Sequence, residues 1–135
     1  MFKIVASPRA WWPVVFAGVT EEGAIIENRF QMRFALLDED AHQALMVEAR
    51  DLLTRDGEDA DGAALLFSQI AADFVVRIAE DWREVVIDNG TKEGDPLPWS
   101  RENLPIVLRQ PNVFRAVISA YRDCRDGREA IRSGN

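Results

Sequence analysis

The stretch Ile26-Glu-Asn-Arg-Phe30-Gln-Met-Arg-Phe34-Ala-Leu36, followed by Leu-Asp38-Glu-Asp-Ala, decides the fold class, because the spacing of its apolar residues changes at Asp38. Before that point every second residue falls on one face, which is the period of a half-buried strand. That face carries Ile26, Asn28, Phe30, Met32, Phe34 and Leu36. After it, Asp38 is a favourable N-cap, and apolar residues recur at helical spacing. The chain is therefore expected to be an α+β protein.

Upstream of this strand, residues 11–20 are apolar and β-branched, and Glu21-Glu22-Gly23 forms a turn sequence. The two strands are expected to pair as an antiparallel hairpin. Pro13 cannot donate a backbone hydrogen bond, so the first strand is expected at a sheet edge. Phe2-Lys-Ile-Val5 is expected to add a short third strand, which would extend the hairpin to a small antiparallel meander.

Downstream, three further helices follow the one that Asp38 begins and that ends before Asp56. Apolar residues at helical spacing over residues 67–82 predict the central helix of the core. Ser100 is expected to cap a short helix that Pro105 kinks or delays. Pro111 is expected to open the last helix, with Phe114, Val117, Ile118, Tyr121 and Cys124 inward. The prediction is a hairpin or meander packed against about four α-helices in a single domain, 1–135, with a frayed end at 127–135.

Composition narrows the function. The chain has 135 residues and 47% apolar residues, enough for one core. Its formal charge of −7 disfavours binding to nucleic acid or to an anionic membrane, since both require excess Lys and Arg. No apolar run has the length of a membrane span, and the first residues lack a secretory signal, so a cytoplasmic location is expected.

Residues able to carry chemistry are few. His42 has no Cys or second His at ligand spacing, and the single Cys124 occupies a core-facing helix position, so neither a metal nor a cofactor is expected. Asp56, Glu58 and Asp61 lack the alternating ligands and the closing Glu of an EF-hand loop. No phosphate loop or nucleophile motif is present. We expect a protein that is not an enzyme; an enzyme built on carboxylates would need two converging acids.

Residues 82–100 connect two predicted helices and read Trp82-Arg-Glu-Val-Val-Ile-Asp88-Asn-Gly90-Thr-Lys-Glu-Gly94-Asp-Pro96-Leu-Pro98-Trp99-Ser100. Such long connections are uncommon in compact domains and are usually functional or disordered. The tryptophans and prolines of this one predict an ordered, packed segment. With the start Met-Phe-Lys-Ile, the segment Phe30-Gln-Met-Arg-Phe-Ala-Leu-Leu and the continuation Glu-Asn-Leu104, the order of these pieces resembles the small tail assembly chaperones of long-tailed phages. The chain departs from that family in its longer 89–94 turn and in Pro105.

The resemblance implies a non-catalytic factor of a phage or prophage, acting in the cytoplasm of the bacterial host and absent from the mature virion. Family members bind the tape measure protein, keep it soluble and help recruit the tail-tube protein. The alternative is a structural phage component, a minor tail or completion protein, that stays in the virion. The sequence leaves the oligomeric state open, a homo-oligomer included.

A partner site is expected where the hairpin meets the loop. Tryptophan often anchors protein interfaces, and alternation sends Trp11 and Trp12 to opposite faces of their strand. Residues 84–99 add apolar side chains on a non-helical segment. Together they could form a groove for an amphipathic client helix, or they could simply seal the core. The expected partner-binding residues are Trp11, Trp12, Val85, Ile87, Leu97 and Trp99.

Overall fold

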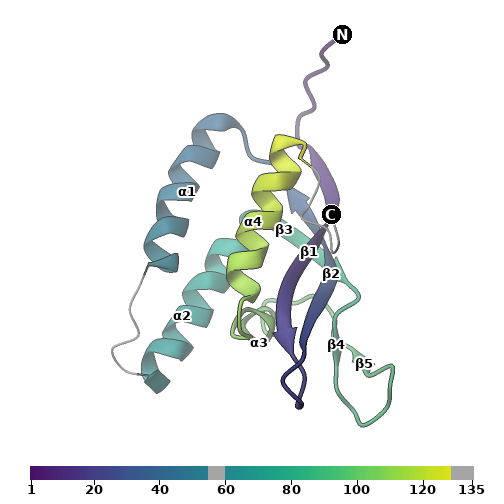
Figure 1. Cartoon of the computed structure of the whole chain (residues 1–135). Helices are drawn as coiled ribbons and strands as arrows, with labels where there is room; N and C mark the ends of the chain where they lie inside the picture. The colour runs from purple at the N-terminus through teal and green to yellow at the C-terminus, as the bar shows by residue number, and fades with distance from the viewer. Residues whose placement is uncertain (55–59, 129–135) are drawn as a thin grey trace.

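A computed structural model describes residues 1–54 and 60–128 of the chain, and it confirms an α+β fold built as one small domain (Figure 1). The elements in chain order are β1 (Arg9–Val19), β2 (Ile25–Ala35), α1 (Glu39–Leu53), α2 (Ala60–Val75), β3 (Ala79–Arg83), β4 (Val86–Ile87), β5 (Asp95–Pro96), α3 (Leu104–Leu108) and α4 (Val113–Asp126).

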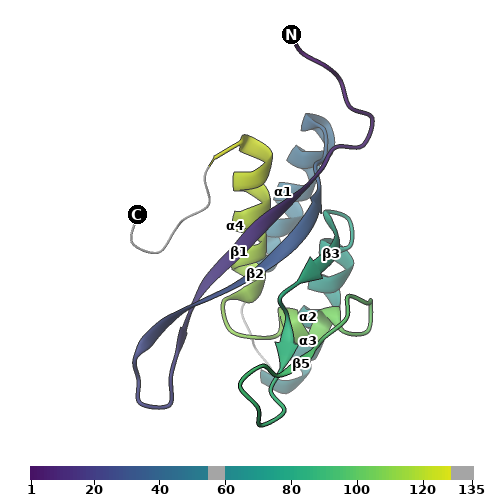
Figure 2. The ribbon, with the colours of Figure 1, turned by 90° about the vertical axis from the view of Figure 1, so that its right-hand side faces the viewer.

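The first three strands form an antiparallel sheet in the order β1-β2-β3, and α1, α2 and α4 cover one of its faces (Figures 1 and 2). The predicted hairpin is confirmed: β1 and β2 pair without interruption from Arg9↔Ala35 to Val19↔Ile25. Pro13 lies on the edge strand, as expected. The predicted alternation holds at Phe30, Met32 and Phe34, which are buried, whereas Ile26 is exposed, because the far end of the hairpin projects past the helices.

The third strand is not the one predicted. Residues 2–5 pair with no other described segment of the chain, and the helix expected over 67–82 ends at Val75. After a short turn, β3 pairs with β2 through Met32↔Trp82 and Gln31↔Arg83. Ile78 and Trp82 are buried as the apolar stripe requires. They reach the core from a turn and a strand, because β2 offers an edge whose pairing outweighs local helical spacing.

Helices α2 and α4 pack through aromatic side chains. Phe114 makes edge-on contacts with Phe67 and Phe74, at 5.4 Å and 5.8 Å between ring centroids. The hydroxyl of fully buried Tyr121 accepts a hydrogen bond from the Leu37 N–H at 3.3 Å, tying α4 to the end of the sheet. The core therefore lies between the helices and the end of the sheet that carries Met32 and Phe34, here called its proximal half.

His42 and Cys124 are both buried in this core. Burial lowers the pKa of His42, helped by the positive charge of Arg125, and its ring lies 5.8 Å from the ring of Tyr121. Burial raises the pKa of Cys124 to about 11, so its thiol stays protonated near neutral pH. Both side chains therefore pack in the core.

The remaining helix boundaries follow local chemistry. Ser100 accepts a hydrogen bond from the Asn103 N–H at 3.0 Å, and α3 begins only at Leu104, with Pro105 in its first turn where no N–H is missed. The last helix begins at Val113 instead of at Pro111, and it ends at Gly127 with φ of 72°. Residues 129–135 of the predicted frayed end, and Asp56 and Glu58, lie outside the described residues.

Candidate functional site

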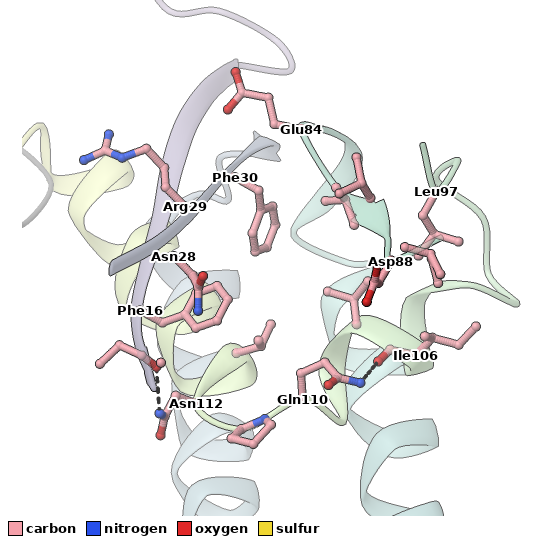
Figure 3. A pocket seen from close by; sticks show the side chains of 18 of the residues that line it. Phe16, Asn28, Arg29, Phe30, Glu84, Asp88, Leu97, Ile106, Gln110 and Asn112 are labelled. Carbon is pink, nitrogen blue, oxygen red and sulfur yellow. Dashed lines mark hydrogen bonds between the residues drawn. The ribbon is translucent and has the colours of Figure 1, made fainter. Parts of the chain in front are cut away.

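The half of the β1–β2 hairpin that carries its turn, here called the distal half, includes Val19 and Ile25. It projects from the body beside the β4–β5 hairpin, and the two enclose a cleft (Figures 2 and 3). Pairing between β2 and β3 stops at Gln31↔Arg83. At Glu84 the backbone adopts φ of 69°, and the chain leaves the sheet. Strand β4 then pairs with β5, through Val86↔Pro96 and Ile87↔Asp95. The path that β3 would have continued along β2 is left open, as a cleft of about 950 Å³.

The cleft is mainly apolar, both inside and at its rim. Its interior is lined from the strands and from α3 by Phe16, Phe30, Val85, Leu97, Ile106 and Val107. The rim carries Val19 and Ile25 on one hairpin and Val86 and Ile87 on the other, with side chains between 43% and 81% exposed. Large apolar side chains gathered around a hollow in this way mark interaction sites in soluble proteins.

Backbone groups of β2 also face the cleft. Leu36 donates its N–H to Pro8, on the β1 side, and Ala35 donates its N–H to Ile78, on the β3 side. Because backbone groups alternate sides along an antiparallel strand, Arg29 and Glu27 direct theirs to the same side as Ala35, beyond the last pair with β3. This part of β2 is therefore an unpaired strand edge.

The opposite edge of the sheet is different. By the same alternation, Pro13 directs its nitrogen away from β2, to the outer edge of β1. A proline nitrogen carries no hydrogen, so this edge lacks a donor at its centre. Of the two sheet edges, the one at the cleft is the one better suited to accept another strand.

Two residues at the cleft have strained backbone conformations. Glu84 and Asn112 adopt positive φ angles of 69° and 71°, which non-glycine residues rarely adopt, and both line the cleft. The Asn112 side chain donates to the Ala17 carbonyl at 3.2 Å and joins the α3–α4 connection to β1 (Figure 3). Such conformations cost about 1–3 kcal/mol each and are concentrated at functional sites.

The β4–β5 hairpin that forms the other wall is ordered. The Trp82 indole N–H donates to the Leu97 carbonyl at 2.7 Å, and its ring meets Trp99 edge-on at 5.0 Å. The connecting turn is closed by side-chain hydrogen bonds, such as Asn89 to Asp95 at 2.9 Å. The connection, expected to be ordered and packed, is a hairpin that Trp82 anchors to the core.

Three of the six predicted partner-binding residues, Val85, Ile87 and Leu97, line the cleft. The three tryptophans do not. Trp12 packs against the core, Trp99 packs on Trp82, and Trp11 lies on the opposite face of β1, with the Arg83 guanidinium 4.0 Å from its ring centroid. Partner binding by these tryptophans stays a prediction, but they do not share the cleft with the other three residues.

Sequence reasoning missed the contribution of the hairpin tip and of α3. Val19 and Ile25 flank the predicted turn, and Ile106 lies in the short helix. The apolar residues on both sides of the polar turn could have indicated this contribution. A hairpin tip that only projects into water needs no apolar side chains.

The part of the chain that the structure describes holds neither a metal-ligand cluster nor a helix that could span a membrane. No group of three or more His, Cys, Asp or Glu residues there could hold a metal ion. None of the helices in residues 1–54 and 60–128 is both long and apolar enough to cross a membrane. The pKa of Glu48 is lowered by its hydrogen bond with Arg77, away from the cleft.

Comparisons with known proteins give no relative for this chain: no family model, no curated protein and no solved structure matches it.

Proposed function

We propose that the protein is a phage tail assembly chaperone, which binds the tape measure protein in the cytoplasm of the bacterial host, keeps it soluble and promotes assembly of the tail-tube protein around it. The observation that carries the proposal is the apolar cleft between two projecting hairpins. The order of sequence motifs that resembles the chaperone family supplies the identity of the client.

The cleft suits a client that exposes apolar side chains. Val85, Ile87 and Leu97 face the hairpin across an opening whose rim is apolar, so the apolar stripe of a client helix could enter it. The formal charge of −7 keeps the complex soluble while the client is covered. Such a protein acts by binding and needs no catalytic group.

Co-expression with the tape measure protein of the same phage genome tests the proposal. The wild-type chain should keep that protein in the soluble fraction. Val86→Glu places a charge at the cleft rim and should lower the soluble fraction several-fold. Val47→Glu is the matched control, since Val47 is an equally exposed valine on α1, outside the cleft.

Two results would count against the proposal. Equal loss of client solubility in Val86→Glu and Val47→Glu would show that the cleft is not the binding surface, and no gain in solubility from the wild-type chain would remove the chaperone function. Mass spectrometry of purified virions separates the structural alternative: a chaperone should be missing, whereas a minor tail or completion protein should be present in stoichiometric amount.

A further inference from the structure

Residues 1–7, here called the arm, form an apolar segment that pairs with no strand among residues 8–54 and 60–128. Phe2 and Ile4 are 89% and 82% exposed, and Val5 is exposed as well. The arm precedes β1 and projects beyond the end of the sheet (Figure 2). Pro8 is the first residue held to β2, through the Leu36 N–H. The alternation of Phe2 and Ile4 favours a strand, but the structure gives that strand no neighbour.

The cleft lacks a strand of this kind. Its β2 wall presents the unpaired backbone groups of Arg29 and Glu27, and β3 has left the position beside them. An extended segment placed there would hydrogen-bond to β2, and its alternate side chains would meet Phe30 on one face and the rim on the other. The site is therefore also suited to an extended, apolar peptide.

The arm cannot fill the cleft of its own chain. Phe16, where the cleft begins along β1, lies about 23 Å from Arg9 at ~3.3 Å per residue. Phe2 lies seven residues before Arg9, so it can reach at most about 25 Å from Arg9 when the intervening chain is fully extended. Residues 2–7 would have to reverse direction and cross to the far side of β2, which leaves none of them for pairing. An arm in the cleft must come from another molecule.

Charge also favours the arm as the occupant. Its only charged side chain is Lys3, in a chain whose formal charge is −7. The cleft is lined by two acidic residues, Glu84 and Asp88, against one basic residue, Arg29. A cationic apolar strand therefore meets a cleft with a slight excess of negative charge.

We propose that two copies of this chain exchange arms, each arm adding as a strand to β2 in the cleft of the other copy. The exchange is symmetric, so both clefts are filled and the dimer is closed. It buries Phe2 and Ile4 of both copies. The arm occupies the cleft that the proposed client would enter, so arm and client would compete for it, and the dimer can be tested without a client.

Sedimentation equilibrium of the full chain measures the dimer. The wild-type chain should dimerise, and Phe2→Ser with Ile4→Ser should raise the dissociation constant by about tenfold or more. Val47→Ser, at an exposed position on α1 outside the arm and the cleft, should leave the dissociation constant unchanged. A wild-type chain that stays monomeric at ~0.1 mM, or a dimer insensitive to the arm substitutions, would overturn the proposal.

A matched pair of substitutions tests the strand edge. Glu27→Pro removes a backbone N–H that faces the cleft, whereas Glu27→Ala removes only the side chain. Glu27→Pro should weaken the dimer, whereas Glu27→Ala should not. Thermal unfolding shows whether each variant is folded.

Disulfide trapping covers the case in which Glu27→Pro unfolds. Ile4→Cys combined with Val86→Cys should give a covalent dimer under mild oxidation, since Cys124 is buried, while Ile4→Cys with Val47→Cys should not. Equal trapping in the two pairs, or trapping within a single chain, would contradict exchange of arms.

Discussion

The two halves of the β1–β2 hairpin share one uninterrupted register but differ in what lies beside them. In the proximal half, Met32 and Phe34 are fully buried between the helices and next to β3. In the distal half, Val19 and Ile25 are exposed, and no strand pairs with β2 on the cleft side among the described residues. The comparison shows that alternation and turn sequence form the hairpin, whereas burial depends on partners from elsewhere in the chain.

Substitutions should destabilise the protein most in the covered, proximal region. Phe74→Ala removes a buried ring that contacts Phe114, and it should lower the free energy of unfolding by about 3–5 kcal/mol. Chemical denaturation measures the change, with Val47→Ala as the exposed control. An unchanged midpoint for Phe74→Ala would show that α2 is peripheral to the core.

A smaller effect is expected where the two regions meet. Trp82→Phe keeps an aromatic ring but loses the hydrogen bond to the Leu97 carbonyl, which should cost about 1–3 kcal/mol. Hydrogen exchange should accelerate in β4–β5 more than in α4, because Trp82 anchors that hairpin. Uniform acceleration through the whole chain would show instead that the hairpin and the core unfold as one unit.

The contribution of His42 should be smaller still and should depend on pH. Burial and Arg125 hold its folded pKa below 6.5, so below about pH 6.5 the unfolded chain takes up a proton that the folded chain does not. Stability present above that pH is therefore lost as the pH falls toward the folded pKa. In His42→Gln, the fall in unfolding free energy between about pH 7 and pH 5.5 should be reduced. An identical pH profile in the variant would assign the fall to other groups.

The smallest effect is expected in the distal half. Ile25→Ser changes a side chain that is exposed on the cleft rim, so the free energy of unfolding should shift by no more than about 0.5 kcal/mol. Destabilisation as large as that of Phe74→Ala would break the comparison, because it would mean that the rim is packed in the isolated chain.

Local patterns in the sequence predict much of the proximal half. Phe30, Met32 and Phe34 alternate, Asp38 caps α1 by accepting from the Ala41 N–H at 2.9 Å, and Gly127 ends α4. These features depend on neighbours in sequence, which periodicity and capping rules describe. The predictions made from these local patterns are therefore the ones that the structure confirms.

The boundary between α2 and β3 could not be predicted in this way. Phe74, Ile78 and Trp82 follow helical spacing, yet strand pairing also sends Trp82 inward. No local pattern distinguishes a continued helix from a strand here. Pairing with the free edge of β2 decides in favour of the strand. The cleft is harder again, since it exists because Glu84 turns the chain out of the sheet. Val85, Ile87 and Leu97 were predictable as apolar loop residues, but their meeting with Val19 and Ile25 was not.

Pro13 has a consequence for the size of any assembly. A sheet that accepts a strand at one edge and offers a competent edge on the other side can grow without limit, as fibrils do. Here the outer edge of β1 lacks a donor at Pro13, so a strand bound in the cleft has no counterpart to propagate from. Strand addition to this protein stops after one step. At high protein concentration, it should give particles of fixed stoichiometry instead of filaments.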